Sequence, residues 1–343
     1  MTVSFVIILL IGLPCLELFL RAFTHPPFSP GYLITNPTRH YELRPGFLGH
    51  TYGAALKINS YGFRGDDGPL PLGPETYRIA IYGDSLAFSQ GVEADEAFPK
   101  QLEHELNSSA QRPLGIKDFY VYNLATPGYN TADEWDDLKS SFSRFRPNLI
   151  VIQFTLDQST FYVPPKTVNQ VELIRSLKDK LRYLYVYDFL GQRLFKFQHK
   201  LARHETQKTS PLAGLEPLYA DDYPGWIECQ KSIRSIAQFA KSKKVPVLFA
   251  LFEETDRIAP TIEADPKLPI LKKIIATLKE NGISYIWVAH DALRKYSGQE
   301  RGLQISASDG HLSLTAHRLI ADGLFRYILE NRVVPWKPTT LRD

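Results

Sequence analysis

Residues 78–86 read RIAIYGDSL, a short apolar run that ends in glycine and two polar side chains. Four more short apolar runs follow, and segments of helical periodicity separate them. Strands that alternate with helices predict βαβ units and a parallel sheet covered on both faces. We therefore expect an α/β fold with five parallel strands. The expected strands are 78–82, 119–124, 149–154, 245–251 and 285–288, and the expected helices are 98–106, 132–145, 226–240, 268–278 and 314–329.

Composition narrows the class of protein. Of the 343 residues, 44% are hydrophobic and 22% are charged, which is typical of a globular chain and not of a disordered one. The 40 basic and 37 acidic side chains leave a net charge of +3, too balanced for a dedicated nucleic-acid binder. The only two cysteines, Cys15 and Cys229, exclude a disulfide scaffold and a four-cysteine zinc site.

The first residues differ from this average. Residues 3–20 read VSFVIILLIGLPCLELFL, in which Glu17 is the only charged side chain. Eighteen residues of helix rise about 27 Å, close to the roughly 30 Å of a bilayer core. We expect residues 1–23 to form an uncleaved membrane anchor. A buried N-terminal helix is the alternative, because Glu17 and Pro14 are unfavourable in a bilayer.

The rest of the chain divides into four parts. Residues 24–76 are rich in turn formers and predict a strand-and-turn lead-in. The α/β domain is expected over 77–331, interrupted by an insertion at about 160–222, and a tail follows over 332–343.

The insertion is basic. Residues 166–208 hold ten Lys/Arg and four Asp/Glu. Four apolar residues form a helical stripe, and four basic residues lie beside it. Such a helix can bind an anionic membrane surface. Alternatively, it can pack on the domain while the basic side chains extend their charged ends to solvent. The stripe is Leu190, Leu194, Phe197 and Leu201, and the basic residues are Arg193, Lys196, Lys200 and Arg203.

Polar side chains follow the expected strands. Gly83-Asp84-Ser85 comes after the first, Pro127-Gly128 after the second and Asp157-Gln158 after the third, and Asp309-Gly310-His311 precedes the last helix. The carboxyl ends of parallel strands meet at one edge of a sheet, so these groups are expected together. A serine nucleophile needs a base, and the base needs an orienting acid. The plainer alternatives are a helix N-cap for Ser85 and turns at Gly128 and Asp309-Gly310.

These blocks resemble the SGNH (GDSL-type) hydrolase family. The flanking stretch 58–65, INSYGFRG, is similar to a bacterial membrane-anchored subgroup of that family. The resemblance implies a flavodoxin-like three-layer α/β/α fold, the SGNH hydrolase fold, without metal or cofactor. It implies Ser85 as nucleophile, His311 as general base, Asp309 as the acid that holds the imidazole, and the backbone N–H groups of Ser85 and Gly128 as oxyanion donors.

The resemblance also implies a reaction and a place. The expected reaction is ester hydrolysis or O-acyl transfer on an acylated carbohydrate or lipid, through an acyl-serine intermediate. The expected location of the domain is the periplasmic side of a membrane. Arg21, Arg39 and Arg44 follow the apolar segment and, read by the positive-inside rule, argue for the cytoplasmic side.

Two positions depart from the family pattern. Asp157 stands where the family has an Asn that donates to the oxyanion. Three outcomes are open: Asp157 donates as a protonated carboxyl in a dry site, Gln158 supplies the amide, or the domain is a catalytically impaired one that binds glycan or a partner protein. The acid Asp309 stands two residues before His311, whereas the commoner spacing of three would place it at Ser308. We associate the spacing of two with domains that act on exported polysaccharides.

Overall fold

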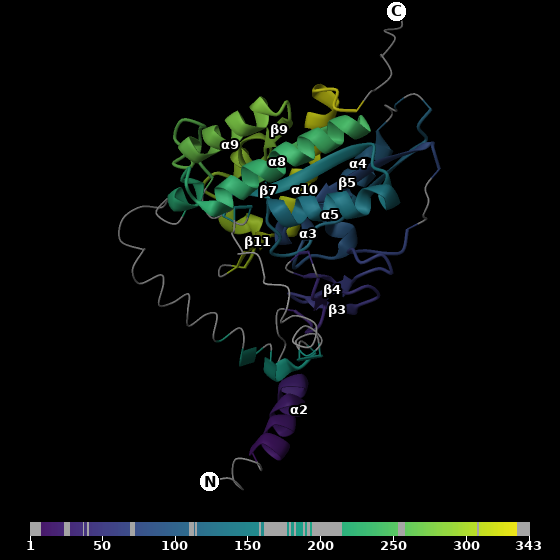
Figure 1. Cartoon of the computed structure of the whole chain (residues 1–343), viewed down its shortest axis with the longest axis vertical. Helices are drawn as coiled ribbons and strands as arrows, with labels where there is room; N and C mark the ends of the chain where they lie inside the picture. Colours follow the sequence, from purple (N-terminus) through teal and green to yellow (C-terminus); the bar gives the residue numbers. More distant parts are fainter. Residues whose placement is uncertain are drawn as a thin grey trace, which may run out of the picture.

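A five-stranded parallel sheet forms the centre of the fold (Figure 1). The computed structural model describes residues 8–23, 28–36, 38–39, 41–68, 73–109, 113, 115–157, 159–160, 215–252, 258–306 and 309–334, with short pieces between 177 and 193. The strand order β6-β5-β7-β8-β9 is the doubly wound order of flavodoxin-like folds, so the predicted fold class is confirmed. The strands are β5 (Thr76–Tyr82), β6 (Asp118–Asn123), β7 (Leu149–Thr155), β8 (Val247–Phe252) and β9 (Ser284–Trp287).

Helices cover both faces of the sheet, as predicted. Alternate strand residues enter two apolar clusters, Ile79 and Ile81 on one face and Ala80 and Tyr82 on the other. Helices α4 and α10 contact each other over the first face, and α5 and α8 contact each other over the second, next to α9. The five helices are α4 (Phe98–Ser108), α5 (Thr131–Phe145), α8 (Pro224–Lys243), α9 (Leu268–Glu280) and α10 (Leu314–Glu330).

The lead-in forms two small antiparallel sheets. Leu43, Leu56 and Ile58 are buried in the same cluster as Ile79, so the lead-in packs on the α/β domain rather than forming a separate unit. Its strands are β1 (Leu33–Ile34), β2 (Glu42–Leu43), β3 (Leu48–Thr51) and β4 (Ala54–Lys57). Figure 1 shows β3 and β4 between the main sheet and the N-terminal helix.

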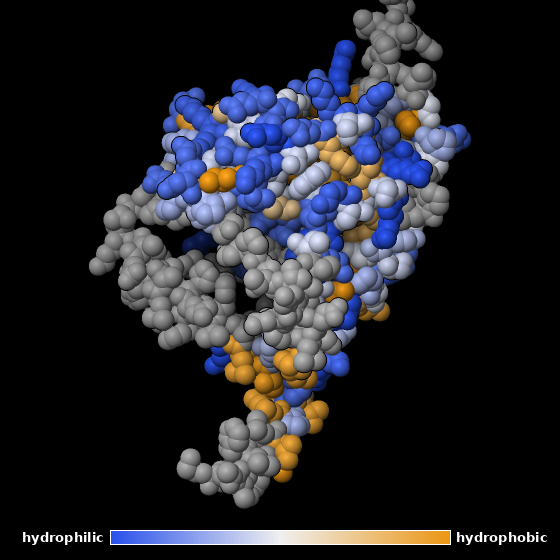
Figure 2. Space-filling model, viewed as in Figure 1, coloured by the Kyte–Doolittle hydropathy of each residue, from blue (hydrophilic) through white to orange (hydrophobic). Residues whose placement is uncertain are grey.

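The N-terminal residues form a protruding apolar helix. A helical turn, η1 (Ile8–Gly12), leads into α2 (Leu13–Phe23), where only Leu20 is buried. Apolar side chains therefore face outward along this segment (Figure 2), and the alternative of a buried N-terminal helix is wrong for α2. Across the described residues, no helix combines the length and apolarity that crossing a membrane requires.

Residues 183–186 of the insertion are hydrogen-bonded to α2. Glu17 accepts the backbone N–H groups of Tyr185 at 3.0 Å and Val186 at 2.9 Å, and Arg21 donates to the Tyr183 carbonyl at 2.8 Å. Of the predicted stripe and its basic neighbours, Leu190 and Arg193 are described. Leu194, Lys196, Phe197, Lys200, Leu201 and Arg203 lie outside the described residues, so both interpretations of the insertion remain predictions.

Candidate active site

Ser85 is the first residue of a short helix, α3 (Ser85–Phe88), that begins just beyond β5. The N-cap of this helix is Asp84, whose Oδ1 accepts the backbone N–H of Leu86 at 2.8 Å. The alternative of Ser85 as N-cap is therefore wrong. Ser85 is half-buried at this edge of the sheet.

Gly83 is required by the close approach of Gln153 from β7. A Cβ on Gly83 would lie 2.5 Å from Oε1 and 2.8 Å from Cβ of Gln153. Gln153 is fully buried, and its Oε1 accepts the backbone N–H groups of Asp84 at 3.0 Å and Ala87 at 3.2 Å. One amide thus fixes the turn that presents Ser85. The sequence offered a signal for it, a polar residue inside the apolar run LIVIQF, which our prediction did not use.

Two carboxyl groups, Asp84 before Ser85 and Glu134 on α5, are buried and interact electrostatically. Burial raises the pKa of Asp84 to about 6, although hydrogen bonds from Thr155 and the Leu86 N–H act in the opposite direction. Glu134 on α5 is 1% exposed, and neither of its carboxyl oxygens has a hydrogen-bond partner among the described residues. Burial, and then the negative charge of Asp84, raise the pKa of Glu134 well above its ordinary value.

The second block lies under a tyrosine of the lead-in. Gly128 has a φ of +78°, and a Cβ there would lie 2.2 Å from the Tyr41 hydroxyl oxygen. That hydroxyl donates to the Pro127 carbonyl at 2.6 Å, and the Tyr129 hydroxyl donates to the Tyr41 carbonyl at 2.6 Å. The glycine is needed for both its backbone conformation and this contact.

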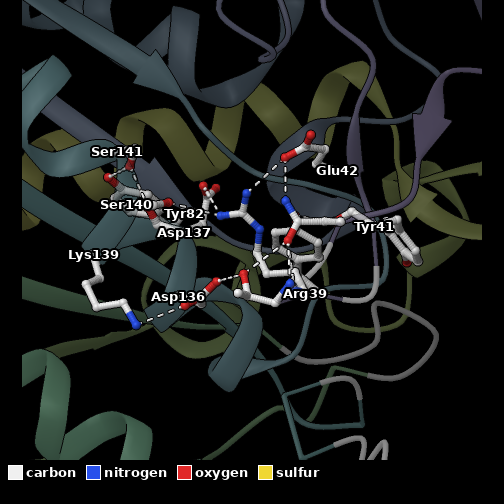
Figure 3. A network of polar contacts seen from close by, with 12 residues as sticks. Arg39, Tyr41, Glu42, Tyr82, Asp136, Asp137, Lys139, Ser140 and Ser141 are labelled. Atoms are coloured by element: carbon white, nitrogen blue, oxygen red, sulfur yellow. Dashed lines mark hydrogen bonds and ion pairs between the residues drawn. The ribbon is translucent and has the colours of Figure 1, made fainter. Parts of the chain in front are cut away.

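An arginine fastens this part of the lead-in to α5 (Figure 3). The side chain of Arg39 is 9% exposed and donates to Asp137 at 2.8 Å and Glu42 at 3.2 Å. Thr38 donates to Asp136, the neighbouring carboxylate on α5, at 2.6 Å. The network holds the chain on either side of Tyr41 against the domain.

Arg64 holds the loop that follows α3. It is 4% exposed and donates to the carbonyl oxygens of Phe88 at 2.7 Å, Ser89 and Val92. Ser89 ends the helix in the left-handed conformation, with a φ of +67°, so these bonds restrain an unfavourable turn. Burial lowers the pKa of Arg64 to about 10, which leaves the guanidinium charged at neutral pH.

Asp309 and His311 form a hydrogen-bonded pair. They lie on the strand β11 (Asp309–Leu312), which pairs with β10 (Gln304–Ser306), so the predicted loop is a β-hairpin. The Nδ1 atom of His311 is 2.5 Å from Oδ1 of Asp309. Burial raises the Asp309 pKa, but hydrogen bonds from Tyr52, the His311 backbone and the His311 ring outweigh it and hold the pKa below its ordinary value.

The hairpin brings this pair to the serine helix, because β11 packs against α3. From the other side, Asn123 at the end of β6 donates to the Ala87 carbonyl of α3 at 2.8 Å. The first block and the acid–base block therefore meet at the carboxyl edge of the sheet.

The third block, Asp157-Gln158, differs from the first and last blocks in the exposure of its acidic side chain. Asp157 follows β7, and its side chain is exposed to solvent. Gln158, the other predicted donor, lies outside the described residues.

Other polar features belong to the scaffold or lie apart from these blocks. His317 on α10 is fully buried and accepts the Phe98 backbone N–H at 3.2 Å, and burial lowers its pKa to about 3. The described part of the chain contains no group of three or more His, Cys, Asp or Glu residues placed to hold a metal ion. A cavity of about 280 Å³ lies between the lead-in and α4, and Arg64, Lys100 and Tyr120 are in its lining.

Comparisons with known proteins give similar folds at low identity. No family model and no curated protein matches the sequence. The chain is similar to the crystal structure of TesA, at 14% identity over 75% of this chain and 99% of that one, with a TM-score of 0.44. It is also similar to the psychrotrophic esterase EstA from Pseudoalteromonas sp., at 12% identity over 74% of this chain and 98% of that one, with a TM-score of 0.42. A third similar structure is the acetyl xylan esterase AlAXEase, at 14% identity over 73% of this chain and 99% of that one, with a TM-score of 0.41.

Proposed function

We propose that the chain is a serine ester hydrolase or O-acyltransferase of the SGNH type. The observation that carries the proposal is the Asp309–His311 pair at 2.5 Å, on a strand packed against the helix that begins with Ser85. Both elements sit at the carboxyl edge of a parallel sheet, where α/β proteins place their working groups. The hydrogen bonds of Gln153 and Arg64 hold the serine turn and the loop after it, as a positioned nucleophile requires.

The reaction proceeds in two halves. Ser85 Oγ attacks the carbonyl carbon of the acyl ester while His311 takes the hydroxyl proton, and Asp309 holds the imidazole in orientation. The backbone N–H groups of Ser85 and Gly128 receive the negative oxygen of the tetrahedral intermediate. The intermediate then collapses, and the leaving alcohol takes the proton from His311. Water or an acceptor hydroxyl attacks the acyl-serine by the same steps in reverse, giving an acid or a new ester.

An acylated carbohydrate or lipid is the proposed substrate. Support comes from the spacing of two between Asp309 and His311, which we associate with domains that act on exported polysaccharides. The exposed apolar helix α2 supports a membrane location, and we place residues 1–23 as an anchor and the domain in the periplasm. Membrane fractionation tests this: the full chain should resist alkaline extraction, and a chain starting at Thr24 should be released.

Hydrolysis of p-nitrophenyl acetate tests the function. Ser85→Ala and His311→Ala should each abolish turnover, while His290→Ala should leave it unchanged. His290 is a matched control because its Nδ1 also faces an aspartate, Asp291, at 2.9 Å. Turnover that survives Ser85→Ala in folded protein would contradict the proposal.

A second function, a catalytically impaired SGNH-like domain that binds glycan or a partner protein, is favoured by one observation. The exposed carboxylate of Asp157 stands where the family has an amide donor, and a negative charge beside a developing oxyanion opposes catalysis. Asp157→Asn discriminates between the two. A gain in turnover of about 100-fold or more from a near-zero wild-type rate would favour impairment, and little change from a measurable rate would favour the enzyme.

A further inference from the structure

Tyr52 occupies a backbone conformation that is unfavourable for its own side chain. Tyr52 and Gly53 form the two-residue turn between β3 and β4, with φ angles of +48° and +88°. Turns with positive φ at both central residues usually carry Asn-Gly or Gly-Gly, since a residue with a Cβ is strained there. A tyrosine held in such a turn points to a functional constraint on its position.

The side chain of Tyr52 reaches the acid–base pair. Its ring centroid lies 5.5 Å from that of the His311 imidazole, and its hydroxyl lies near enough to the Asp309 carboxylate for each group to shift the pKa of the other. Burial, and then Asp309, raise the pKa of the Tyr52 hydroxyl. The phenol therefore keeps its proton at neutral pH and is available as a hydrogen-bond donor.

Other parts of the chain pack against the turn on both sides. The Tyr52 ring packs edge-on against the Phe28 ring, with 5.1 Å between the ring centroids. The backbone of Phe28 forms an antiparallel β-bridge with Thr51, the residue before Tyr52. On the other side a Cβ added to Gly91 would lie 3.5 Å from Tyr52 Cβ and 3.0 Å from Ile305 of β10. The tip of the lead-in hairpin thus sits beside both the loop that follows α3 and the hairpin that carries His311.

We propose that Tyr52 is a positioning residue that holds the Asp309 carboxylate in the orientation that receives His311. The proposal rests on the proposed ester-transfer function. The Oδ1 atom of Asp309 accepts both the ring and the backbone N–H of His311. In this proposal the Tyr52 hydroxyl, which contributes to the lowered pKa of Asp309, is a third donor from a different part of the chain. The lead-in, which lies outside the α/β domain in sequence, then supplies part of the active site.

Kinetics of the full chain with p-nitrophenyl acetate test the role. Tyr52→Phe keeps the ring and removes the hydroxyl, so kcat should fall about 10-fold while KM changes less than about twofold. Tyr52→Asn suits the left-handed turn and removes the whole phenol, so it should keep the fold and lose more activity. Tyr61→Phe is the matched control, a lead-in tyrosine that stacks on Phe63, and should keep the wild-type kcat.

A spectroscopic readout separates this proposal from the function on which it rests. The proton between His311 Nδ1 and Asp309 should give a far-downfield ¹H resonance that disappears in His311→Ala. In Tyr52→Phe it should shift upfield or broaden, and in Tyr61→Phe it should not move. Wild-type kcat and an unchanged resonance in Tyr52→Phe would overturn the positioning role. Absence of turnover in wild-type protein would overturn the proposed function, and the resonance would still report whether Tyr52 orients the pair.

Discussion

The Nδ1 atom of His311 lies 2.5 Å from Oδ1 of Asp309, and the backbone N–H of the same histidine donates to the same oxygen at 3.0 Å. Both residues lie on β11, where positions two apart share one face of the strand. Extended backbone therefore accommodates an acid two residues before the base. The departure from the commoner spacing of three is explained by the hairpin that replaces the predicted loop.

We predict that Asp309→Asn, a change of one atom in the acid–base pair, strongly lowers kcat. Asp309→Asn keeps the shape of the side chain but removes the charge that orients and stabilises the imidazole, so kcat should fall by about 10²–10⁴. Initial rates with p-nitrophenyl acetate measure this. Asp291→Asn, at the surface His290–Asp291 pair, should leave kcat unchanged. A kcat close to that of the wild type in Asp309→Asn would exclude Asp309 as the acid.

Arg64 predicts a stability effect. Arg64→Lys cannot reach the carbonyls of Phe88, Ser89 and Val92 together and leaves buried acceptors unpaired, so the free energy of unfolding should fall by about 2–4 kcal/mol. Urea unfolding measures the change. The control is Arg78→Lys, because Arg78 also donates to backbone carbonyls but at the surface, and it should cost less than about 1 kcal/mol. Equal losses in the two variants would contradict the role given to Arg64.

We predict that substitutions at Gly128 and Tyr41 have coupled effects on the free energy of unfolding. Gly128→Ala places a Cβ 2.2 Å from the Tyr41 hydroxyl oxygen and should destabilise the fold by about 1–3 kcal/mol. The next atom of that side chain, Cζ, is at 3.5 Å, so Tyr41→Phe removes the collision. A double-mutant cycle of unfolding free energies should therefore show that Gly128→Ala costs less in the Tyr41→Phe protein. Additive effects would mean that the two groups do not approach as described.

Glu134 predicts a pH-dependent stability difference. Because its pKa is raised in the folded state, the fold keeps a proton that the unfolded chain loses as pH rises above the ordinary value of 4.5. Stability from this group is therefore full at low pH and declines as pH rises towards the folded pKa. Glu134→Gln has no proton to lose, so its advantage over wild type should grow as the pH rises above 4.5.

Thermal unfolding across this pH range measures the effect. Glu228→Gln, which changes a half-exposed glutamate on α8, is the control and should show no growing difference. A Glu134→Gln protein that is uniformly less stable than wild type at every pH would show that the carboxylate has a favourable partner.

The sheet could be predicted because parallel strands covered on both faces read as continuous apolar runs. Every observed strand of the sheet begins within two residues of its predicted position, because runs such as LIVIQF leave little ambiguity. The hairpin β10–β11 was missed because Asp309-Gly310 carries the chemistry of a turn. The N-cap was assigned to Ser85 as an alternative because serine and aspartate cap helices equally well, and only coordinates distinguish them.

The supporting residues could not be predicted, because their roles come from contacts between distant parts of the chain. Arg64 and Phe88 are 24 residues apart, and Tyr41 and Pro127 are 86 apart. Tyr52 meets Asp309 only when the lead-in packs on the domain. Glu134 stands in the acidic stretch TADEWDD, which is typical of a solvated helix face, whereas the structure buries it.

Labelling with a fluorophosphonate tests the central claim, that Ser85 is an activated nucleophile. Intact mass spectrometry should show one adduct on the wild-type chain, and peptide mapping should place it on Ser85. His311→Ala should slow the labelling strongly, and Ser89→Ala, which changes a buried serine in the next turn, should not remove the adduct. Folded wild-type protein that takes up no label, or that takes it up at a serine other than Ser85, would contradict the account.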